Sequence, residues 1–218
     1  ETGVAASSYN DVAIPGDTGT RISLTDDLEA EAGPFYRFQA VARFGERHSV
    51  RLLYAPLTLS ASGTLDGDVS YVDATFPAGT PLEARYQFNS HRLTYRYSVW
   101  LDGLDELAVG FTGKIRDARV SLVGGGRAEE FSNVGFVPLV HVLWRWRFAP
   151  PWGLLLEVDA AAAPQGRAED VMAALELHPS PMVSLRAGYR MVEGGADNDR
   201  VYTFTWIHYA LVGAALRF

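Results

Sequence analysis

The sequence lacks cysteine and contains no long hydrophobic run. Without cysteine among its 218 residues, the chain forms no disulfides and offers no thiolate metal ligands. The longest apolar stretches, "GLLLEV" and "AAAAP", are far shorter than the roughly 18 residues of a membrane helix. A membrane-spanning helix is therefore excluded within these residues. A membrane β-barrel is not excluded, because each barrel strand needs only about 9–11 residues of alternating apolarity.

Positive charge is also scarce. The net charge of −7 argues against a nucleic acid partner, since phosphate binding needs a basic surface. Lys114 is the only lysine among nineteen basic residues, and the rest are arginines. A GC-rich genome and selection for the multidentate pairing of arginine both explain this bias. The stretch "ETGVAASS" has no charged start or apolar core, so we expect no signal peptide in it.

Strict alternation of apolar and polar residues recurs along the whole chain and predicts β-strands. The first candidate is weak and the other nine are clear. We expect one domain over residues 1–218, since all-β barrels commonly reach this length. The ten predicted strands are 2–10, 35–44, 49–57, 91–100, 107–116, 136–148, 152–160, 171–178, 183–191 and 207–218.

The predicted connections alternate in length. Short turns are expected at 45–47, 101–105, 149–151 and 179–181, and mostly long loops at 11–34, 59–85, 118–131, 164–169 and 194–200. Short turns at one end and longer loops at the other are typical of outer-membrane barrels, which also have an even strand number. The pattern predicts an all-β fold, a ten-stranded antiparallel up-and-down transmembrane β-barrel with short periplasmic turns and longer extracellular loops.

Charge and aromatic residues predict which face meets lipid. Arginines recur on the strand face opposite the apolar one. Aromatic residues lie at both ends of the apolar band, as a bilayer interface favours: Trp100, Trp146 and Trp152 near the short turns, and Tyr202, Phe204 and Trp206 near a long loop. A membrane barrel is therefore expected, and a soluble lipocalin-like barrel is the alternative.

In its pattern of predicted strands and loops, the chain resembles the small bacterial outer-membrane β-barrel proteins. Phe218, preceded by apolar residues at every second position, is similar to the signal that the assembly machinery of such barrels reads. The resemblance implies integral localisation in a Gram-negative outer membrane. It also implies contact with outer-membrane lipid and lipopolysaccharide and with the barrel-assembly machinery. We expect a monomer by default. No motif links the chain to one characterised family.

Charged residues on the polar strand faces are predicted to fill the lumen. Cations outnumber anions among them, so we expect some arginines to face water, backbone carbonyls or an anionic ligand. Because ten strands lie near the size at which side chains fill a barrel, structural filling is expected and a narrow anion path is the alternative. The predicted network comprises Arg37, Arg43, Arg51, Arg92, Arg96, Lys114, Arg116, His141, Arg145, Glu157, Asp159, Glu176, Arg186 and Arg190.

Pro138 lies in the middle of the predicted strand 136–148. Proline has no N–H for a strand ladder, and a closed barrel has no edge on which to place it. We expect a break in the ladder at Pro138, and a lateral seam is one form that this break can take. Such seams admit acyl chains in barrels that exchange lipid-like molecules sideways, among them the palmitoyl transferase that this chain resembles in general plan. A tolerated β-bulge is the alternative.

No catalytic, cofactor-binding or metal-binding residues are predicted. His178, Ser180 and Glu193 resemble the His-x-Ser and glutamate of lipid A deacylases, but a strand length separates them. His91 and His208 lie on the lipid-facing side at the outer head-group level without an obvious nucleophile. The sequence therefore favours a non-enzymatic barrel that binds or passes small apolar or anionic molecules, or has a structural role. The alternatives are an enzyme that modifies outer-leaflet lipid and an adhesin that presents its loops.

Overall fold

The computed structural model describes residues 1–164 and 166–218, and strands are the only regular secondary structure in them. These residues contain no helix that is long and apolar enough to span a membrane. In chain order the strands are β1 (Thr2–Ala13), β2 (Ile22–Ser23), β3 (Glu29–Ala30), β4 (Gly33–Tyr36), β5 (Phe38–Phe44), β6 (His48–Ala55), β7 (Thr58–Thr64), β8 (Val69–Tyr71), β9 (Ala74–Phe76), β10 (Pro81–Asp102), β11 (Asp105–Gly124), β12 (Arg127–Ala149), β13 (Trp152–Ala163), β14 (Gly166–Ser180), β15 (Val183–Asn198) and β16 (Val201–Leu216).

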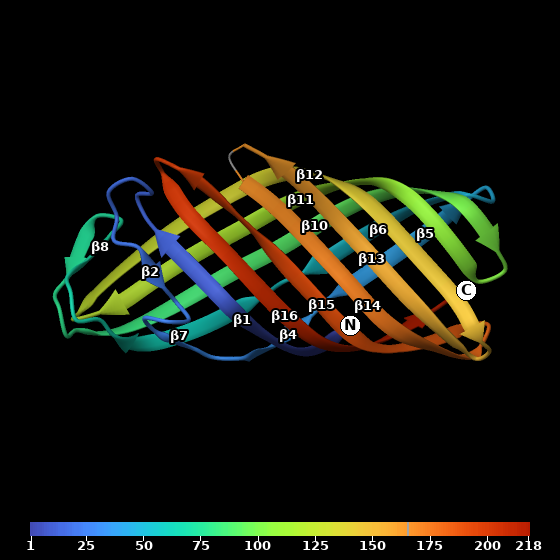
Figure 1. Cartoon of the computed structure of the whole chain (residues 1–218), viewed down its shortest axis with the longest axis horizontal. Helices are drawn as coiled ribbons and strands as arrows, with labels where there is room; N and C mark the ends of the chain where they lie inside the picture. Colours follow the sequence, from blue (N-terminus) through green and yellow to red (C-terminus); the bar gives the residue numbers. More distant parts are fainter. Residues whose placement is uncertain (165) are drawn as a thin grey trace.

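Fourteen of the strands form one antiparallel sheet, in which β10 to β16 pair in chain order with an up-and-down topology. The strand order is β2-β1-β16-β15-β14-β13-β12-β11-β10-β6-β5, with β3, β4 and β7 paired at its flanks. Figure 1 shows the long strands tilted and wrapped around a common axis, with β1 beside β16. The result is a barrel-shaped sheet around a central lumen.

Two of the predicted strands are interrupted. The segment 35–44 is divided at Arg37 into β4, which pairs with β1, and β5, which pairs with β6. The next strand is divided at Pro56 into β6 and β7, and both of these pair with β10. Segment 33–44 thus pairs with β1 near one end of the strand order and with β6 near the other. The number of strands differs from the expected ten partly because of these two divisions.

The four short turns lie at one end of the sheet, on the right in Figure 1. They connect β5 to β6, β10 to β11, β12 to β13 and β14 to β15. Gly45 and Gly103 lie in the first two turns with φ angles of 64° and 62°. This left-handed conformation is one that glycine adopts without a steric penalty. The end that carries the tight turns was therefore correctly predicted.

The prediction of long loops at 118–131 and 194–200 was wrong, because both segments are tips of strand hairpins. β11 and β12 remain paired up to Gly124 and Arg127, and β15 and β16 are paired across most of the second segment. The expected loop 59–85 likewise contains most of β7 and the start of β10. Ladder hydrogen bonds join backbone groups, so a strand continues where its outward side chains are no longer apolar.

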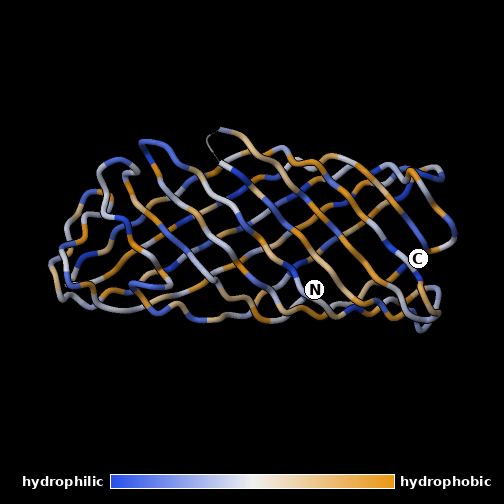
Figure 2. The backbone as a smooth tube through the Cα atoms, in the orientation of Figure 1, coloured by the Kyte–Doolittle hydropathy of each residue, from blue (hydrophilic) through white to orange (hydrophobic). Residues whose placement is uncertain are grey.

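Side chains alternate between the outer face and the lumen along the long strands. On β11 the outward Val109, Phe111 and Ile115 are 42%, 70% and 48% exposed, whereas the inward Thr112 and Lys114 are 2% and 4% exposed. Figure 2 shows the same alternation of hydrophobic and hydrophilic residues along many strands. The sheet therefore has an apolar outside and a charged inside, the reverse of a soluble protein.

The outer face changes from apolar to polar toward the hairpin tips. On β11, for example, the outward Ile115 is followed by Asp117 and Arg119. The change forms a boundary around much of the barrel, which we call the outer polar boundary. On β16 it is limited to His208, because the next outward residues are Trp206, Phe204 and Tyr202. By alternation, its first polar residues are Ser8, His91, Asp117, Ser132, Glu169, Glu193 and His208.

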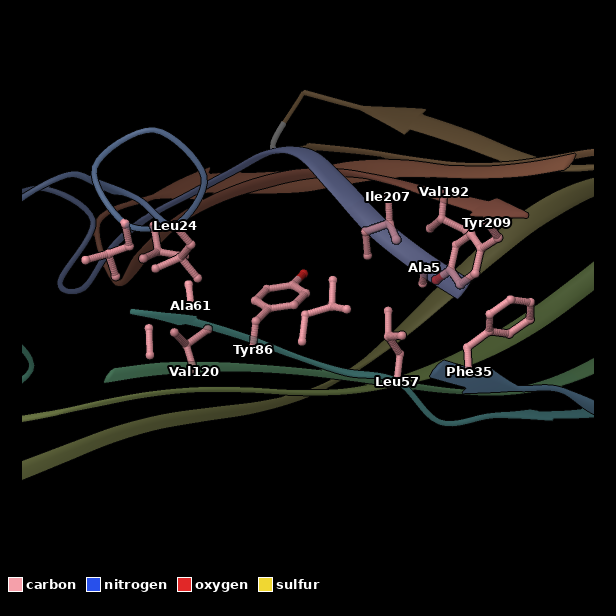
Figure 3. Packing of buried hydrophobic residues seen from close by; sticks show 14 of the residues in the cluster. Ala5, Leu24, Phe35, Leu57, Ala61, Tyr86, Val120, Val192, Ile207 and Tyr209 are labelled. Carbon is pink, nitrogen blue, oxygen red and sulfur yellow. The ribbon is translucent and has the colours of Figure 1, made fainter. Parts of the chain in front are cut away.

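Beyond this boundary, apolar side chains and folded loops occupy part of the lumen. Figure 3 shows Tyr86 and Val120 on one wall facing Ile207 and Val192 on the other. The β8–β9 hairpin covers the tips, and the Tyr71 hydroxyl donates a 2.9 Å hydrogen bond to the carbonyl of Val120. Burial raises the pKa of the Tyr71 hydroxyl, so it remains a donor at neutral pH. The β8–β9 hairpin and the loops thus cover the outer end of the lumen, and the lumen beneath them is only partly filled.

Candidate functional site

A buried ionic network fills the middle of the lumen, and Asp159 on β13 is at its centre. Four donors approach the Asp159 carboxylate: Arg51 at 3.0 Å, Arg92 at 2.9 Å, the Thr112 hydroxyl at 2.7 Å and His141 Nδ1 at 2.8 Å. All five side chains are buried. Because a carboxylate offers about four acceptor positions, the hydrogen-bonding capacity of Asp159 is fully used.

Glu157, two residues earlier on the same strand, extends the network. Its carboxylate contacts Arg51, lies 3.1 Å from Arg96 Nη2 and lies 3.6 Å from Arg190 Nη2. Arg96 Nε also donates a 2.9 Å hydrogen bond to Nε2 of His141. Since the arginine can only donate, His141 accepts at Nε2 and carries its proton on Nδ1, where it donates to Asp159. The contacts thus assign one tautomer.

Asp170 on β14 is a third buried carboxylate, which the sequence analysis missed. It contacts Arg190, and its Oδ2 lies 2.7 Å from Arg92 Nη2 and 3.3 Å from Arg37 Nη2. Asp170 falls one residue before the predicted strand 171–178, but continuing the alternation of that strand would have placed it inward. Its presence reduces the surplus of cations that was expected in the lumen.

A second network lies near the short turns. Glu106, also missed because it precedes the predicted strand 107–116, lies 2.6 Å from Arg43 Nη2 and 3.4 Å from Arg145 Nη1. Arg145 Nε donates to Glu176 at 2.8 Å, and Arg186 lies 3.3 Å from the same carboxylate. Twelve of the predicted lumen residues therefore lie in the two networks, which leaves Lys114 and Arg116.

These two cations line a cavity next to the ionic network. The cavity has a volume of about 370 Å³, near the lower end of the range for small-molecule sites. Lys114 follows Thr112 on the same face of β11, so the cavity begins where the Asp159 network ends. Its apolar lining is contributed chiefly by Tyr86, Phe88, Val120, Phe131, Val137, Ala161, Ala162, Ala163, Ala168, Val192 and Val201.

The cavity lies behind an unpaired part of the wall between β12 and β13. The two strands pair only as far as Val140 and Ala160. Beyond that point β12 continues to Arg127 beside β11, whereas the β13–β14 hairpin ends at the pair Ala163–Gly166. Pro138 and Ala162 both line the cavity, one on each side of this unpaired part. We call it the wall gap.

Pro138 lies at the point where the β12–β13 ladder stops. On its other side the β11–β12 ladder is continuous, and Pro138 is paired with Gly113. In an antiparallel ladder, alternate residues direct their N–H groups to the strand on one side and to the strand on the other. Because the β11–β12 ladder is continuous at Pro138, which has no N–H, the Pro138 nitrogen points toward β13. Extending the register of β13 would place Ala162 opposite Pro138, where the missing N–H removes a hydrogen bond. Pro138 is also exposed on the outer face.

A separate polar cluster lies on the outer wall, at the outer polar boundary. His208 contacts the Ser8 hydroxyl through Nε2 and the Tyr189 hydroxyl through Nδ1. The other histidine that sequence singled out, His91, stacks on Tyr54 at 5.2 Å between ring centroids. The sequence did not indicate Ser8, because it lies at a bulge in the weakly alternating β1.

No protein-family model matches the sequence, and no curated protein matches it. Among solved structures, the whole chain aligns with 95% of Ail, the attachment invasion locus protein of Yersinia pestis, at 12% identity and a TM-score of 0.42. It aligns with 88% of the translocator domain of the autotransporter NalP from Neisseria meningitidis at 11% identity and a TM-score of 0.32. The chain resembles small bacterial outer-membrane β-barrel proteins. Both scores are too low to indicate what it binds.

Proposed function

We propose that the chain is an integral outer-membrane β-barrel that binds a small, largely apolar molecule, which passes sideways from the membrane into the cavity. One observation carries this proposal: a cavity of about 370 Å³ lies directly behind the wall gap. A site that opened only to water would have its mouth at a barrel end. This cavity is lined by Pro138 and Ala162, which border the wall gap.

The outer face supports the membrane location. Large exposed hydrophobic residues cover it on the side of the short turns, where Trp100, Trp146 and Trp152 are all exposed. A soluble protein rarely exposes so continuous an apolar surface, whereas a bilayer requires one and favours tryptophan at its interfaces. The outer polar boundary then marks the outer head-group level, and outer-membrane lipid and lipopolysaccharide would surround the barrel there.

The pairing at the N-terminal strands supports a closed barrel. If β4 with β5 and β6 with β7 each act as one strand, the barrel has ten strands. Contact of β4 with β1 and of β5 with β6 joins the two ends of the strand order. A closed wall satisfies the backbone groups that hydrocarbon cannot. In such a closed wall, the wall gap between β12 and β13 is a local place where backbone groups lack ladder partners.

The mouth of the cavity lies close to this interface. On β12 the outward Val134, Phe136 and Val140 are exposed apolar residues, and the polar residues begin at Ser132. The wall gap starts at Pro138 and so lies at the upper edge of the apolar belt. An amphiphilic molecule in the outer leaflet would reach the gap without leaving the membrane.

The ionic network favours binding over conduction. The charged side chains around Asp159 and Glu157 are at most 6% exposed, and each carboxylate is held by several arginines. A path along the axis would require these ion pairs to separate, which is costly in a poorly solvated space. The cavity is therefore better suited to hold a molecule than to pass it to the other side.

The experiment compares two alanine-to-phenylalanine variants in phosphatidylcholine vesicles, with the apolar fluorophore N-phenyl-1-naphthylamine as the probe. Ala168 lines the cavity, and Ala168→Phe should fill it and abolish saturable probe binding. Ala187 is exposed on the outer face of β15, so Ala187→Phe should bind the probe like the unmodified chain. Equal binding by all three proteins would contradict the proposal.

A second candidate function is hydrolysis of an outer-leaflet lipid ester on the outer wall. The contacts of His208 with Ser8 and Tyr189 favour it, because a nucleophile, a base and a third group that orients the base are the usual parts of a hydrolytic site. Ser8→Ala should then abolish release of fatty acid from phospholipid vesicles. Ser62→Ala, at another exposed serine, is the control. Unchanged release in Ser8→Ala would exclude this activity.

A further inference from the structure

Lys114 differs from every other buried cation in the described residues. The buried cations are Arg37, Arg51, Arg92, Arg96, Lys114 and Arg190. Each of the five arginines lies within 4.0 Å of at least one carboxylate. For Lys114, residues 1–164 and 166–218 provide no hydrogen bond and no ion pair. Its Nζ atom lies 4.6 Å from the ring centroid of Phe88.

No carboxylate of the described residues contacts Lys114 directly, although Asp170 lies near enough to interact with its charge. Its neighbour across the ladder on β10 is Arg92, whose guanidinium is already bound to Asp159 and Asp170. Its neighbour on β12 is Val137. The next inward residue on β11, Arg116, donates to the neutral amide oxygen of Asn133, and residues 1–164 and 166–218 give it no carboxylate partner. Lys114 and Arg116 thus give one wall of the cavity a positive charge.

The cavity lining does not supply a counter-charge to Lys114. Glu193 is the one carboxylate among the described lining residues. It is bound by Tyr9 at 2.7 Å and by Arg167, both on the outward side of the wall. A buried ammonium without a partner is unfavourable, because it has lost the solvation of water. An anion in the cavity would offset this loss through charge-assisted hydrogen bonds.

We propose that the cavity binds a single-chain amphiphilic carboxylate of the fatty acid type, with its carboxylate on Lys114. This inference rests on the proposed lateral binding function and specifies its ligand. Lys114 is paired with Val137, the residue next to Pro138, so the ammonium lies at the level of the wall gap. The apolar chain packs against Tyr86, Phe131 and the other apolar lining residues.

The volume limits the size of the ligand. A cavity of about 370 Å³ holds the equivalent of about a dozen waters, which suits one chain of medium length. A phospholipid with two acyl chains does not fit. Arg116, the next inward cation on β11, also lines the cavity, and its Nε has no partner among the described residues. Lys114 and Arg116 therefore suit an anionic head group, and the probes of the test distinguish a carboxylate from a phosphate.

The test measures binding of dodecanoate labelled with carbon-13 at the carboxyl group, by NMR, to the protein in phosphatidylcholine nanodiscs. Dodecanol and dodecyl phosphate serve as neutral and phosphate probes of the same chain length. The unmodified chain should bind dodecanoate most tightly. Lys114→Met keeps an unbranched side chain of similar length, and it should weaken dodecanoate binding roughly 10- to 100-fold while dodecanol binding stays the same.

Other results separate this inference from the proposed function. If Lys114→Met binds dodecanoate as well as the unmodified chain does, the role of Lys114 is wrong even though the cavity binds apolar molecules. Tighter binding of dodecyl phosphate than of dodecanoate would overturn the choice of carboxylate. If Ala168→Phe leaves binding of all three probes unchanged, the cavity itself is not the site. Lys114→Arg, which keeps the charge, should retain part of the dodecanoate affinity.

Discussion

His141 and Asp159 face each other on the neighbouring strands β12 and β13, and a 2.8 Å hydrogen bond joins Nδ1 of the histidine to the carboxylate. Nε2 of the same ring accepts from Arg96. The ring therefore connects the Asp159 part of the ionic network to the Glu157 part and uses both of its nitrogens. Its complete burial explains why a ring, and not water, fills this position.

Replacing His141 with phenylalanine should destabilise the fold markedly. Asp159 would lose one donor and Arg96 Nε would lose its acceptor, and each unsatisfied buried group costs about 1–3 kcal/mol. The midpoint of urea unfolding in lipid vesicles, followed by tryptophan fluorescence, measures the effect. His91→Phe is the control, because His91 is exposed and only stacks on Tyr54. Equal midpoints for the two variants would mean that the two hydrogen bonds of His141 do not stabilise the fold.

Glu157→Leu should destabilise the chain by about 3–5 kcal/mol, since it leaves buried guanidinium groups without their carboxylate. Glu130→Leu provides the comparison. Glu130 forms an exposed ion pair with Arg119 at 3.4 Å, and such pairs contribute about 0–1 kcal/mol. The free energy of unfolding is measured for both variants. An unchanged midpoint in Glu157→Leu would indicate that water solvates the lumen at this level.

Arginine on the outer face distinguishes a membrane barrel from a soluble one. Phe111→Arg places a charge within the apolar belt and should cost about 2–4 kcal/mol if lipid surrounds that face. Val123→Arg, on the same strand and the same face, lies beyond the outer polar boundary and should be close to neutral. Unfolding in vesicles gives both values. Two neutral substitutions would favour the soluble barrel.

Pro138→Val should narrow the wall gap. The valine restores an N–H opposite Ala162, so the β12–β13 ladder can extend by one pair beyond Val140–Ala160. We expect slower amide hydrogen exchange at residues 161–163 and a several-fold loss of probe binding. Phe136→Val changes a side chain beside the gap without adding a donor, and it should leave the exchange unchanged. Full binding by Pro138→Val would mean that the proline is merely tolerated.

The middle of each long strand could be predicted from the sequence, and the strand ends and the short strands β2, β3, β8 and β9 could not. Alternation identified the faces of β11 and β12 because lipid requires apolar residues outside. Beyond the outer polar boundary that requirement ends, and outward residues such as Asp117 and Arg119 look like loop residues. Asp170 and Glu106 were missed for a similar reason, since they lie just outside the segments that alternate clearly.

The cavity depends on information that no single segment contains. Pro138 indicated the position of an irregularity, but the gap also needs the β13–β14 hairpin to end at Ala163 and Gly166 while β12 continues to Arg127. Lys114 was predicted to face the lumen with the arginines. Lys114 lies apart from the carboxylates that bind these arginines. This separation depends on distances across the barrel, which the sequence pattern does not encode.

Lateral entry through the wall gap, as proposed, would determine which concentration controls the occupancy of the cavity. A molecule that reaches Pro138 and Ala162 from the bilayer is in equilibrium with its mole fraction in the outer leaflet, and not with its concentration in water. At a fixed total amount of ligand, additional lipid would dilute the molecule within the leaflet and empty the cavity. The barrel would then respond to the composition of its own membrane.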